Sequence, residues 1–392
     1  MLSRLHHRPL KLLNLKLFKY LCISITMKKE DFEAIAILIG TIVGAGVLGI
    51  PYIVSKAGLL TGLIDIIIIG ILLLITNYIF GESIINIKKH HQMTGYTKII
   101  LGKKWGYLMM FLVFASIYGA LIAYIMGEGS VLATLFGSQK TLLFSILFFI
   151  IAFSIVKSKI KTIGVLEIFL DSAFIFIIFL IALFSTGSIN TTNITGFDVT
   201  NIFLPYGVIL FAFLGISAIP QMKEVLNNDK KRLRRAILIG SSIPIILYLI
   251  FTFAVVSVTG LNTTEVATIG LGQALGYKML IFCNLFAFFI MSTAFLSLAH
   301  AVKETYIYDC KLNKTLSWML ACLVPFAIFL AIRSIAGFKD ILNITGGIAG
   351  GAMGILLATM FLKTRKKKEL KDYLLCLTLI AVFLAGIVYT IV

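Results

Sequence analysis

Charge is scarce in this sequence, since only 13% of its 392 residues are Asp, Glu, Lys or Arg. A soluble domain carries roughly 25% charged residues, so the chain lacks the polar surface that it would need to face water. It also lacks ten-residue segments of alternating hydrophobicity, which argues against a transmembrane β-barrel. Apolar runs recur instead from Ile35 to Val392, each long enough to cross a bilayer core of roughly 30 Å. Helices are the remaining structure that satisfies the backbone in lipid, so we predict an all-α integral membrane protein.

Motifs for catalysis and metal binding are also lacking. The five cysteines form no CxxC or Cys/His spacing, so they predict neither a metal site nor a disulfide framework. We find no Gly-rich phosphate loop, HExxH or GxSxG motif, and we therefore expect no enzyme activity. The net charge of +18 is divided into short clusters between apolar runs, which is how membrane topology is encoded, so we expect lipid contacts and no nucleic-acid partner.

The basic clusters and the apolar runs together predict eleven spans. We place them near 33–56, 60–82, 106–128, 141–157, 162–186, 201–221, 236–259, 274–301, 316–332, 341–362 and 370–391. With the N-terminus in the cytoplasm, 30 of the 35 Lys and Arg residues fall on the cytoplasmic side. The charge pattern therefore predicts a multi-pass protein of the cell membrane with a cytoplasmic N-terminus and an external C-terminus.

Two spans carry helix-breaking residues at matching positions. The first contains four glycines and a proline between Gly40 and Pro51, which makes a poor helix. The sixth repeats its Gly-to-Pro spacing, with Gly46 and Pro51 matched by Gly215 and Pro220. Five spans separate the two starts, so the second half is inserted upside down relative to the first. Interrupted helices at matching places of inverted halves indicate a transporter binding site, although glycines that only permit close packing are the alternative.

This symmetry predicts a division of the chain. A basic cytoplasmic tail covers 1–29, the first repeat 30–186, the second repeat 187–365 and an appended eleventh span 366–392. We interpret the stretch before Met27 as an artefact of start-site choice and assign it no function. In the tenth span, small residues from Gly346 to Gly354 predict close helix packing.

The glycine-rich segment of the first span, followed by Ile50-Pro51 and Ala57-Gly58, resembles the first helix of amino acid permeases. The likeness is to the amino acid–polyamine–organocation superfamily, within it to the amino acid/auxin or hydroxy/aromatic amino acid permease branch. Phe211 to Pro220 resembles the sixth helix of that branch and Ser292 to Leu296 its eighth. The resemblance implies a LeuT-like fold of five plus five inverted helices, with helices one and six broken.

The resemblance also implies site residues. The N–H groups of Gly44, Ala45 and Gly46 would bind a substrate carboxylate. The unwound stretch at Phe211, Phe213 and Gly215 would bind the amino group and cover the site. A tyrosine of the third span, Tyr118 or Tyr124, would face the substrate or else be an ordinary packed aromatic; we favour Tyr118.

The coupling ion is left open between sodium and a proton. By resemblance, a sodium ion would lie between the carbonyls of Gly40 and Val43 and the hydroxyls of Ser292 and Thr293, unless those hydroxyls bond to their own helix. Glu167 and Asp171 share one face near mid-membrane depth and form either a proton relay or a structural hydrogen-bonded pair. Asp65, Glu82 and Glu128 lie nearer the ends of the expected spans, and we interpret them as interfacial.

These observations favour a cation-coupled secondary transporter of amino acids. Because no charged residue lies in the two broken segments, we expect neutral or aromatic substrates. An amino acid exchanger without an ion, and an amino-acid-sensing receptor that resembles germinant sensors, are the alternatives.

Overall fold

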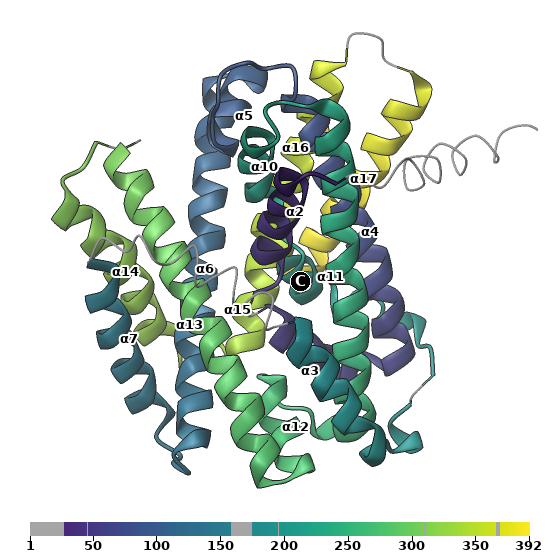
Figure 1. Ribbon diagram of the computed structural model, residues 1–392, viewed down its shortest axis with the longest axis vertical. Coiled ribbons are helices and arrows are strands. Elements are labelled where there is room, and N and C mark those ends of the chain that lie inside the picture. The colour runs from purple at the N-terminus through teal and green to yellow at the C-terminus, as the bar shows by residue number, and fades with distance from the viewer. Residues whose placement is uncertain (1–26, 45, 158–174, 195, 309–310, 366–368) are drawn as a thin grey trace, which may run out of the picture.

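A computed structural model describes residues 27–44, 46–157, 175–194, 196–308, 311–365 and 369–392, and within them the chain forms helices and no strand. The helices run along one direction as an elongated bundle (Figure 1). One end of the bundle holds α5, the α10–α11 turn and the start of α2, and we call it the α5 end. The opposite end holds α12, and we call it the α12 end. The charge pattern predicts that the α5 end is cytoplasmic.

Within the described residues the helices follow the expected order of spans, and 162–174 of the expected fifth span lies outside them. Eight helices of the described part are long and apolar enough to cross a membrane, and α2 and α3 form one further span that bends by 52°. Thr141–Lys157 and Ile175–Ser188 are shorter apolar helices. The helices that form the spans are α2 (Lys29–Ile42) with α3 (Gly46–Ala57), α4 (Leu59–Ile84), α6 (Lys103–Leu135), the shorter α7 (Thr141–Lys157), α9 (Tyr206–Ala212) with α10 (Ile219–Val225), α11 (Lys230–Thr259), α13 (Tyr277–Tyr308), α14 (Lys314–Ile332), α15 (Phe338–Ile344) with η6 (Thr345–Gly350) and α16 (Gly351–Thr364), and α17 (Leu370–Ile391). Two helices, α5 (Met93–Leu101) and α12 (Ala267–Leu275), lie in the connections.

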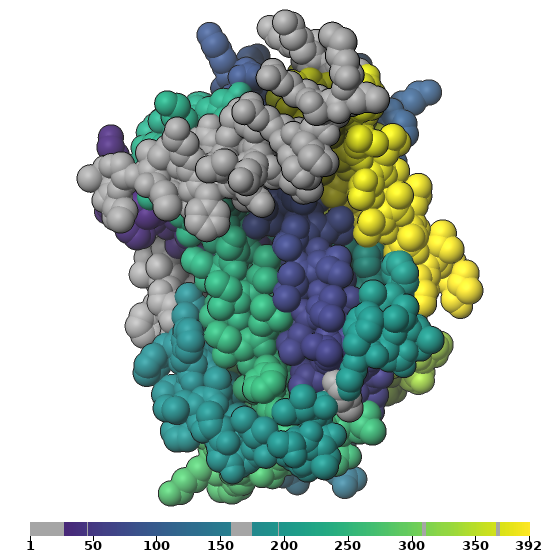
Figure 2. All heavy atoms as spheres, turned by 90° about the vertical axis from the view of Figure 1, so that its right-hand side faces the viewer, coloured from purple at the N-terminus to yellow at the C-terminus, as the bar shows by residue number. Residues whose placement is uncertain are grey.

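The broken helices occupy the centre of the bundle. Helix α2 packs on α11, α3 packs on α9 and α11, and α9 packs on η6. Helices α11 and α4 lie side by side on one face, with α17 at its edge (Figure 2). The two broken segments are therefore enclosed by unbroken helices, which shield their free backbone groups from lipid.

Small residues of the tenth span pack as the sequence predicts. A Cβ at Gly346 would meet backbone atoms of Gly207 and Phe211 in α9, and one at Gly354 would meet the ring of Phe383 in α17. Glycines on one face of η6 and α16 thus admit α9, and those on another face admit α17. The π-helical turn of η6 lies where α9 approaches, and such turns are frequent at functional sites.

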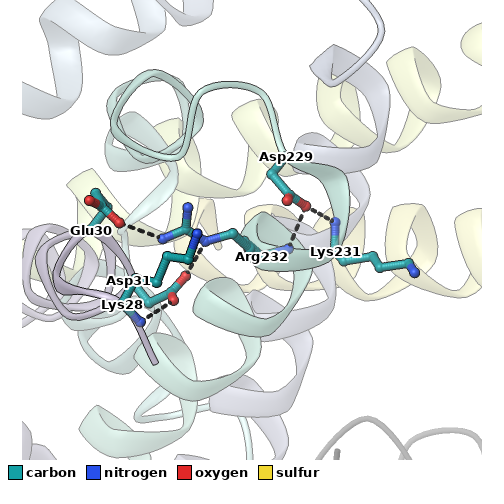
Figure 3. Close-up of polar contacts among 6 residues, drawn as sticks. All are labelled: Lys28, Glu30, Asp31, Asp229, Lys231 and Arg232. Atoms are coloured by element: carbon teal, nitrogen blue, oxygen red, sulfur yellow. Dashed lines mark hydrogen bonds and ion pairs between the residues drawn. The ribbon is translucent and has the colours of Figure 1, made fainter. Parts of the chain in front are cut away.

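An ion-pair cluster joins the first and seventh spans at the α5 end (Figure 3). Helix α11 begins at Asp229, whose Oδ1 accepts from the backbone N–H groups of Lys231 and Arg232 at 2.9 and 3.1 Å. The Arg232 side chain reaches back to α2, where its Nε lies 2.7 Å from Asp31 and its Nη2 2.9 Å from Glu30. The cluster therefore fixes the start of α2 against α11.

The two carboxylates of this ion-pair cluster differ in exposure, and we expect their substitutions to differ in their effect on the free energy of unfolding. The Asp31 side chain is 10% exposed and the Glu30 side chain 45%. Asp31 also accepts from the N–H of Lys28 at 2.8 Å, which caps α2. Asp31→Asn should lower the free energy of unfolding by about 1–2 kcal/mol, because a partly buried charged hydrogen bond is weakened. Glu30→Gln removes the same charge from the same partner and should change little. Thermal unfolding in detergent compares the two, and equal losses would contradict this ranking.

Candidate functional site

The breaks in the first and sixth spans bring free backbone groups to one depth. Helix α2 ends at Ile42 and α3 begins at Gly46; α9 ends at Ala212, and a short turn at Ile216–Ala218 precedes α10. The C-terminal carbonyls of α2 and α9 therefore lie close to the first N–H groups of α3. Helix termini carry partial charges, negative at the carbonyl end and positive at the N–H end. Such a site suits a ligand with one positive and one negative group.

A tyrosine of the seventh span joins the two breaks. The hydroxyl of Tyr248 lies 2.8 Å from the carbonyl oxygen of Ile42 and 3.0 Å from that of Ala212. These are the last helical residues of α2 and α9, and Tyr248 is fully buried. The ring of Phe213 packs on the ring of Tyr248, with the two centroids 4.8 Å apart. Tyr248 was not among the predicted site residues, because one tyrosine within an apolar span forms no pattern.

A cavity of about 200 Å³ lies beside the breaks. Its walls come from α2, α5, α6, the sixth span, α13 and α16, and include Thr41, Met93, Ala120, Tyr124, Phe211, Leu214, Ser217, Leu298 and Met353. Its described lining contains no charged side chain. The hydroxyl of Tyr124 also lies near Gly44, 3.5 Å from where a Cβ on that residue would stand. Tyr124 therefore contacts both the cavity and the break in the first span.

Of the predicted substrate residues, the structure brings Phe211 to this cavity and Gly44 next to it. Gly46 packs on the backbone of Ala212, and Gly215 packs on Ile42. Phe213 is buried against Tyr248 and is not part of the cavity lining. Ala45 lies outside the described residues.

Tyr118, the tyrosine that we favoured for the substrate, lies elsewhere. Its hydroxyl is 2.7 Å from that of Tyr306 and donates to the carbonyl of Leu320 at 3.2 Å. It is absent from the described lining of the cavity. The structure thus brings the alternative, Tyr124, to the break.

The hydroxyl residues predicted to hold a cation have different hydrogen-bond partners. The Thr293 hydroxyl donates to the carbonyl of Phe289 in its own helix at 2.8 Å, as the alternative interpretation held. The Ser292 hydroxyl donates to Glu128 Oε1 at 2.7 Å. These bonds use the proton of each hydroxyl and leave its oxygen lone pairs, so the sodium site between these hydroxyls and the carbonyls of Gly40 and Val43 stays a prediction. Glu167 and Asp171 lie outside the described residues.

The interfacial interpretation of three carboxylates was wrong for Glu128 and Asp65. Glu128 is 0% exposed and Asp65 3%, so both side chains are buried inside the bundle. The reason for Glu128 is that α6 continues to Leu135, seven residues beyond the end that we expected for this span. Glu82 lies in the last turn of α4 and is paired with Arg234 at 2.6 Å.

The cavity beside the breaks opens toward the α5 end. Ser217 lines it together with two further cavities of about 320 and 870 Å³, and the largest of these is also lined by His90, His91 and Lys98 near α5. At the α12 end, a cavity of about 370 Å³ shares no lining residue with it. Among the described residues, cavities that share lining residues therefore lead from the site toward the α5 end, and the cavity at the α12 end is separate from them.

Comparisons with known proteins agree with this architecture. The model of the tryptophan/tyrosine permease family matches residues 27–392. Glutamine transporter 2 of Aliivibrio fischeri (strain ATCC 700601 / ES114) is 24% identical over 361 residues, which are 88% of this chain and 92% of the relative. The crystal structure of MhsT in complex with L-phenylalanine aligns with a TM-score of 0.64 at 15% identity, covering 91% of this chain and 97% of that one. That alignment confirms the predicted LeuT-like fold, and the family match confirms the predicted likeness to amino acid permeases. The chain belongs to the tryptophan/tyrosine permease family.

Proposed function

We propose that this chain is a secondary active transporter of amino acids with uncharged side chains, aromatic ones included. It works in the cell membrane by alternating access, with a cytoplasmic N-terminus, and couples uptake to a cation. The observation that carries the proposal is the pair of broken helices beside a cavity whose described lining has no charge. The substrates named for the family and its relatives, tryptophan, tyrosine, glutamine and phenylalanine, are all uncharged in the side chain.

The free backbone groups bind the two charged groups of the substrate, and the cavity binds its side chain. The amino acid carboxylate binds at the first N–H groups of α3, where the helix dipole is positive. Its ammonium group binds at the carbonyl end of α9. Its side chain enters the cavity among Phe211, Leu214 and Met353, where apolar surface is removed from water. Tyr124 closes the site next to Gly44.

Uptake into proteoliposomes tests the function. The purified protein should accumulate a radiolabelled neutral amino acid under an inward proton or sodium gradient and not without one. Tyr124→Phe should raise the KM about fivefold, because the hydrogen bond that we expect this hydroxyl to make with the bound substrate is lost. Tyr118→Phe removes a hydroxyl from the same helix and should leave the KM unchanged, since its partners are Tyr306 and Leu320.

Other outcomes would replace the proposal. Flux only against preloaded amino acid would identify an exchanger. Stabilisation by amino acids with no flux under any gradient would identify a receptor. A preference for arginine or glutamate would overturn the assignment of uncharged substrates.

A further inference from the structure

We propose that the α5 end carries a binding site for the head group of an anionic phospholipid, formed by Lys230 and Arg365. Lys230 begins α11 and Arg365 follows the last residue of α16, and both helices pack on α4. Such a site depends only on the membrane location of the chain, so it is independent of the proposed transport function.

The carboxylate of Glu82, in the last turn of α4, gathers the cations of the site. Its two oxygens accept hydrogen bonds from Nε and Nη2 of Arg234 at 2.6 and 2.7 Å, so one cation already neutralises it. The Nζ of Lys230 lies 3.8 Å from the same carboxylate, and the charge of Arg365 also acts on it. Two of the three cations around Glu82 are therefore in excess.

Arg365 has a hydrogen-bond donor that no described residue uses. Its Nε is buried and has no hydrogen-bond partner within the described part of the chain. Its guanidinium lies over the ring of Phe361, with Cζ 4.5 Å from the ring centroid, which favours one orientation of the guanidinium plane. A guanidinium oriented in this way suits an acceptor with two oxygens, such as a phosphate.

The charges at the start of α17 leave this region short of one anion. The charge of Arg365 also acts on Lys371, which pairs with Glu369 at 2.6 Å. Asp372 accepts from the backbone N–H of Glu369 at 3.3 Å. With these groups included, four cations face three carboxylates among the described residues. A phosphodiester carries about one negative charge, so a single phospholipid would balance the whole set.

A stripe on α4, apolar apart from Glu82 at its end, leads away from these charges. The residues from 67 to 82 that are not buried are Ile67, Ile68, Ile71, Leu74, Ile75, Tyr78 and Glu82. They recur at intervals of three or four, so they share one face of the helix. Ile75 and Ile71 lie about 10 and 16 Å along α4 from Glu82, comparable to the depth of one leaflet. Acyl chains below a head group at this site would therefore lie along α4, which is exposed between α11 and α17 in Figure 2.

An anionic lipid fits these features better than a soluble anion or a zwitterionic lipid. The cations lie at the ends of membrane-spanning helices, where head groups meet the hydrocarbon core, and basic pockets between such helices bind anionic head groups. A soluble anion would use the charges alone and not the stripe. A zwitterionic lipid brings a cation of its own, which the excess positive charge would repel.

The site also has a structural consequence, because Lys230 begins the helix that holds the broken spans. Helix α11 binds the start of α2 through Arg232 and the ends of α2 and α9 through Tyr248. A head group shared by Lys230 and Arg365 would fix the start of α11 against the end of α16. Binding of the lipid should therefore stabilise the fold.

Unfolding temperatures in a neutral detergent test the site with two double variants. Lys230→Gln combined with Arg365→Gln removes the cations of the site. Lys231→Gln combined with Lys363→Gln removes two charges from the same two helices. The control residues are exposed and are not among the cations that act on Glu82. Phosphatidylglycerol should raise the unfolding temperature of the wild type and of the control by about 2–4 °C, and should leave that of the site variant unchanged.

Three outcomes would overturn the proposal. Equal shifts in the two double variants would show that the lipid acts on the basic surface as a whole. An equal shift of the wild type with phosphatidylcholine would show that the head-group charge is not recognised. An equal shift with inorganic phosphate would show that the cations bind a free anion and no lipid.

Native mass spectrometry keeps the test decisive if Arg365→Gln does not fold. The Lys230 side chain is 44% exposed, so Lys230→Gln should fold. At a phosphatidylglycerol concentration at which the wild type and Lys231→Gln retain one lipid, Lys230→Gln should retain about fivefold less. Arg365→Lys keeps the charge but loses the planar donor pair, and it should fall between them. Equal retention in Lys230→Gln and Lys231→Gln would contradict the site.

Discussion

Tyr248→Phe should lower the rate of amino acid uptake at least about tenfold, because the loss of about 1.4 kcal/mol from a required interaction corresponds to a factor of ten. The substitution removes one oxygen and leaves the ring in place. That oxygen lies within hydrogen-bond distance of the last helical carbonyls of α2 and α9, 2.8 and 3.0 Å away. Without it, the two buried carbonyls lose the one hydroxyl proton that they share, and the two half-helices lose their shared attachment to α11. The conformational cycle should therefore suffer more than the fold.

Tyr206→Phe is the matched control for this experiment. Tyr206 is 3% exposed and begins α9, the half-helix whose end Tyr248 holds. Its buried hydroxyl has no hydrogen-bond partner among the described residues, so its removal breaks no bond. Initial uptake rates per reconstituted protein, together with unfolding temperatures, should separate the variants. Wild-type rates in Tyr248→Phe, or equal losses in both variants, would show that the bridging hydroxyl has no role in transport.

The contrast between Tyr248 and the predicted residues shows what a membrane sequence encodes. Hydropathy and basic clusters fix the spans because lipid and the topology rule act on every residue of a segment. The helix breaks near Gly46 and Gly215 were also predictable, since glycine and proline recur there at the same spacing in two inverted halves. The identity of the site tyrosine was not predictable. Tyr118 and Tyr124 are six residues apart and point to different faces of α6, and a helix that is apolar on all sides carries no signal for which face meets the site.

Glu128 was misjudged for a related reason. The expected span ended at 128, just before Gly129 and Ser130, two small residues of kinds that are also common in loops. In the structure Gly129 instead admits Ser145 of α7, so α6 continues as a packed helix to Leu135. Small residues that permit close packing therefore look the same in a sequence as small residues that end a helix. Only the neighbouring helix reveals the difference.

Gly46→Ala should abolish most uptake and lower stability, because this glycine sets the distance between α3 and α9. A Cβ on Gly46 would stand 2.7 Å from the Cα of Ala212 and 2.9 Å from its Cβ. The nearest contact is backbone, so no side-chain rotation relieves it, and the end of α9 would have to move away. Overpacking of this kind costs about 1–3 kcal/mol, which predicts a fall in uptake of about tenfold or more. The moved segment includes the Ala212 carbonyl that Tyr248 holds.

Gly44→Ala makes the same chemical change two residues earlier in the same break and is the matched control. There a Cβ would meet only the Tyr124 hydroxyl, at an ordinary contact distance of 3.5 Å. We expect its unfolding temperature to equal that of the wild type and any effect to appear in the KM. Adding Ala212→Gly to Gly46→Ala removes the 2.9 Å contact but leaves the 2.7 Å one, so recovery of uptake should be partial. If Gly46→Ala and Gly44→Ala both transport normally, the glycines serve only to unwind the helix. If only Gly46→Ala fails and Ala212→Gly partly rescues it, close contact between the two broken helices is itself a requirement for transport.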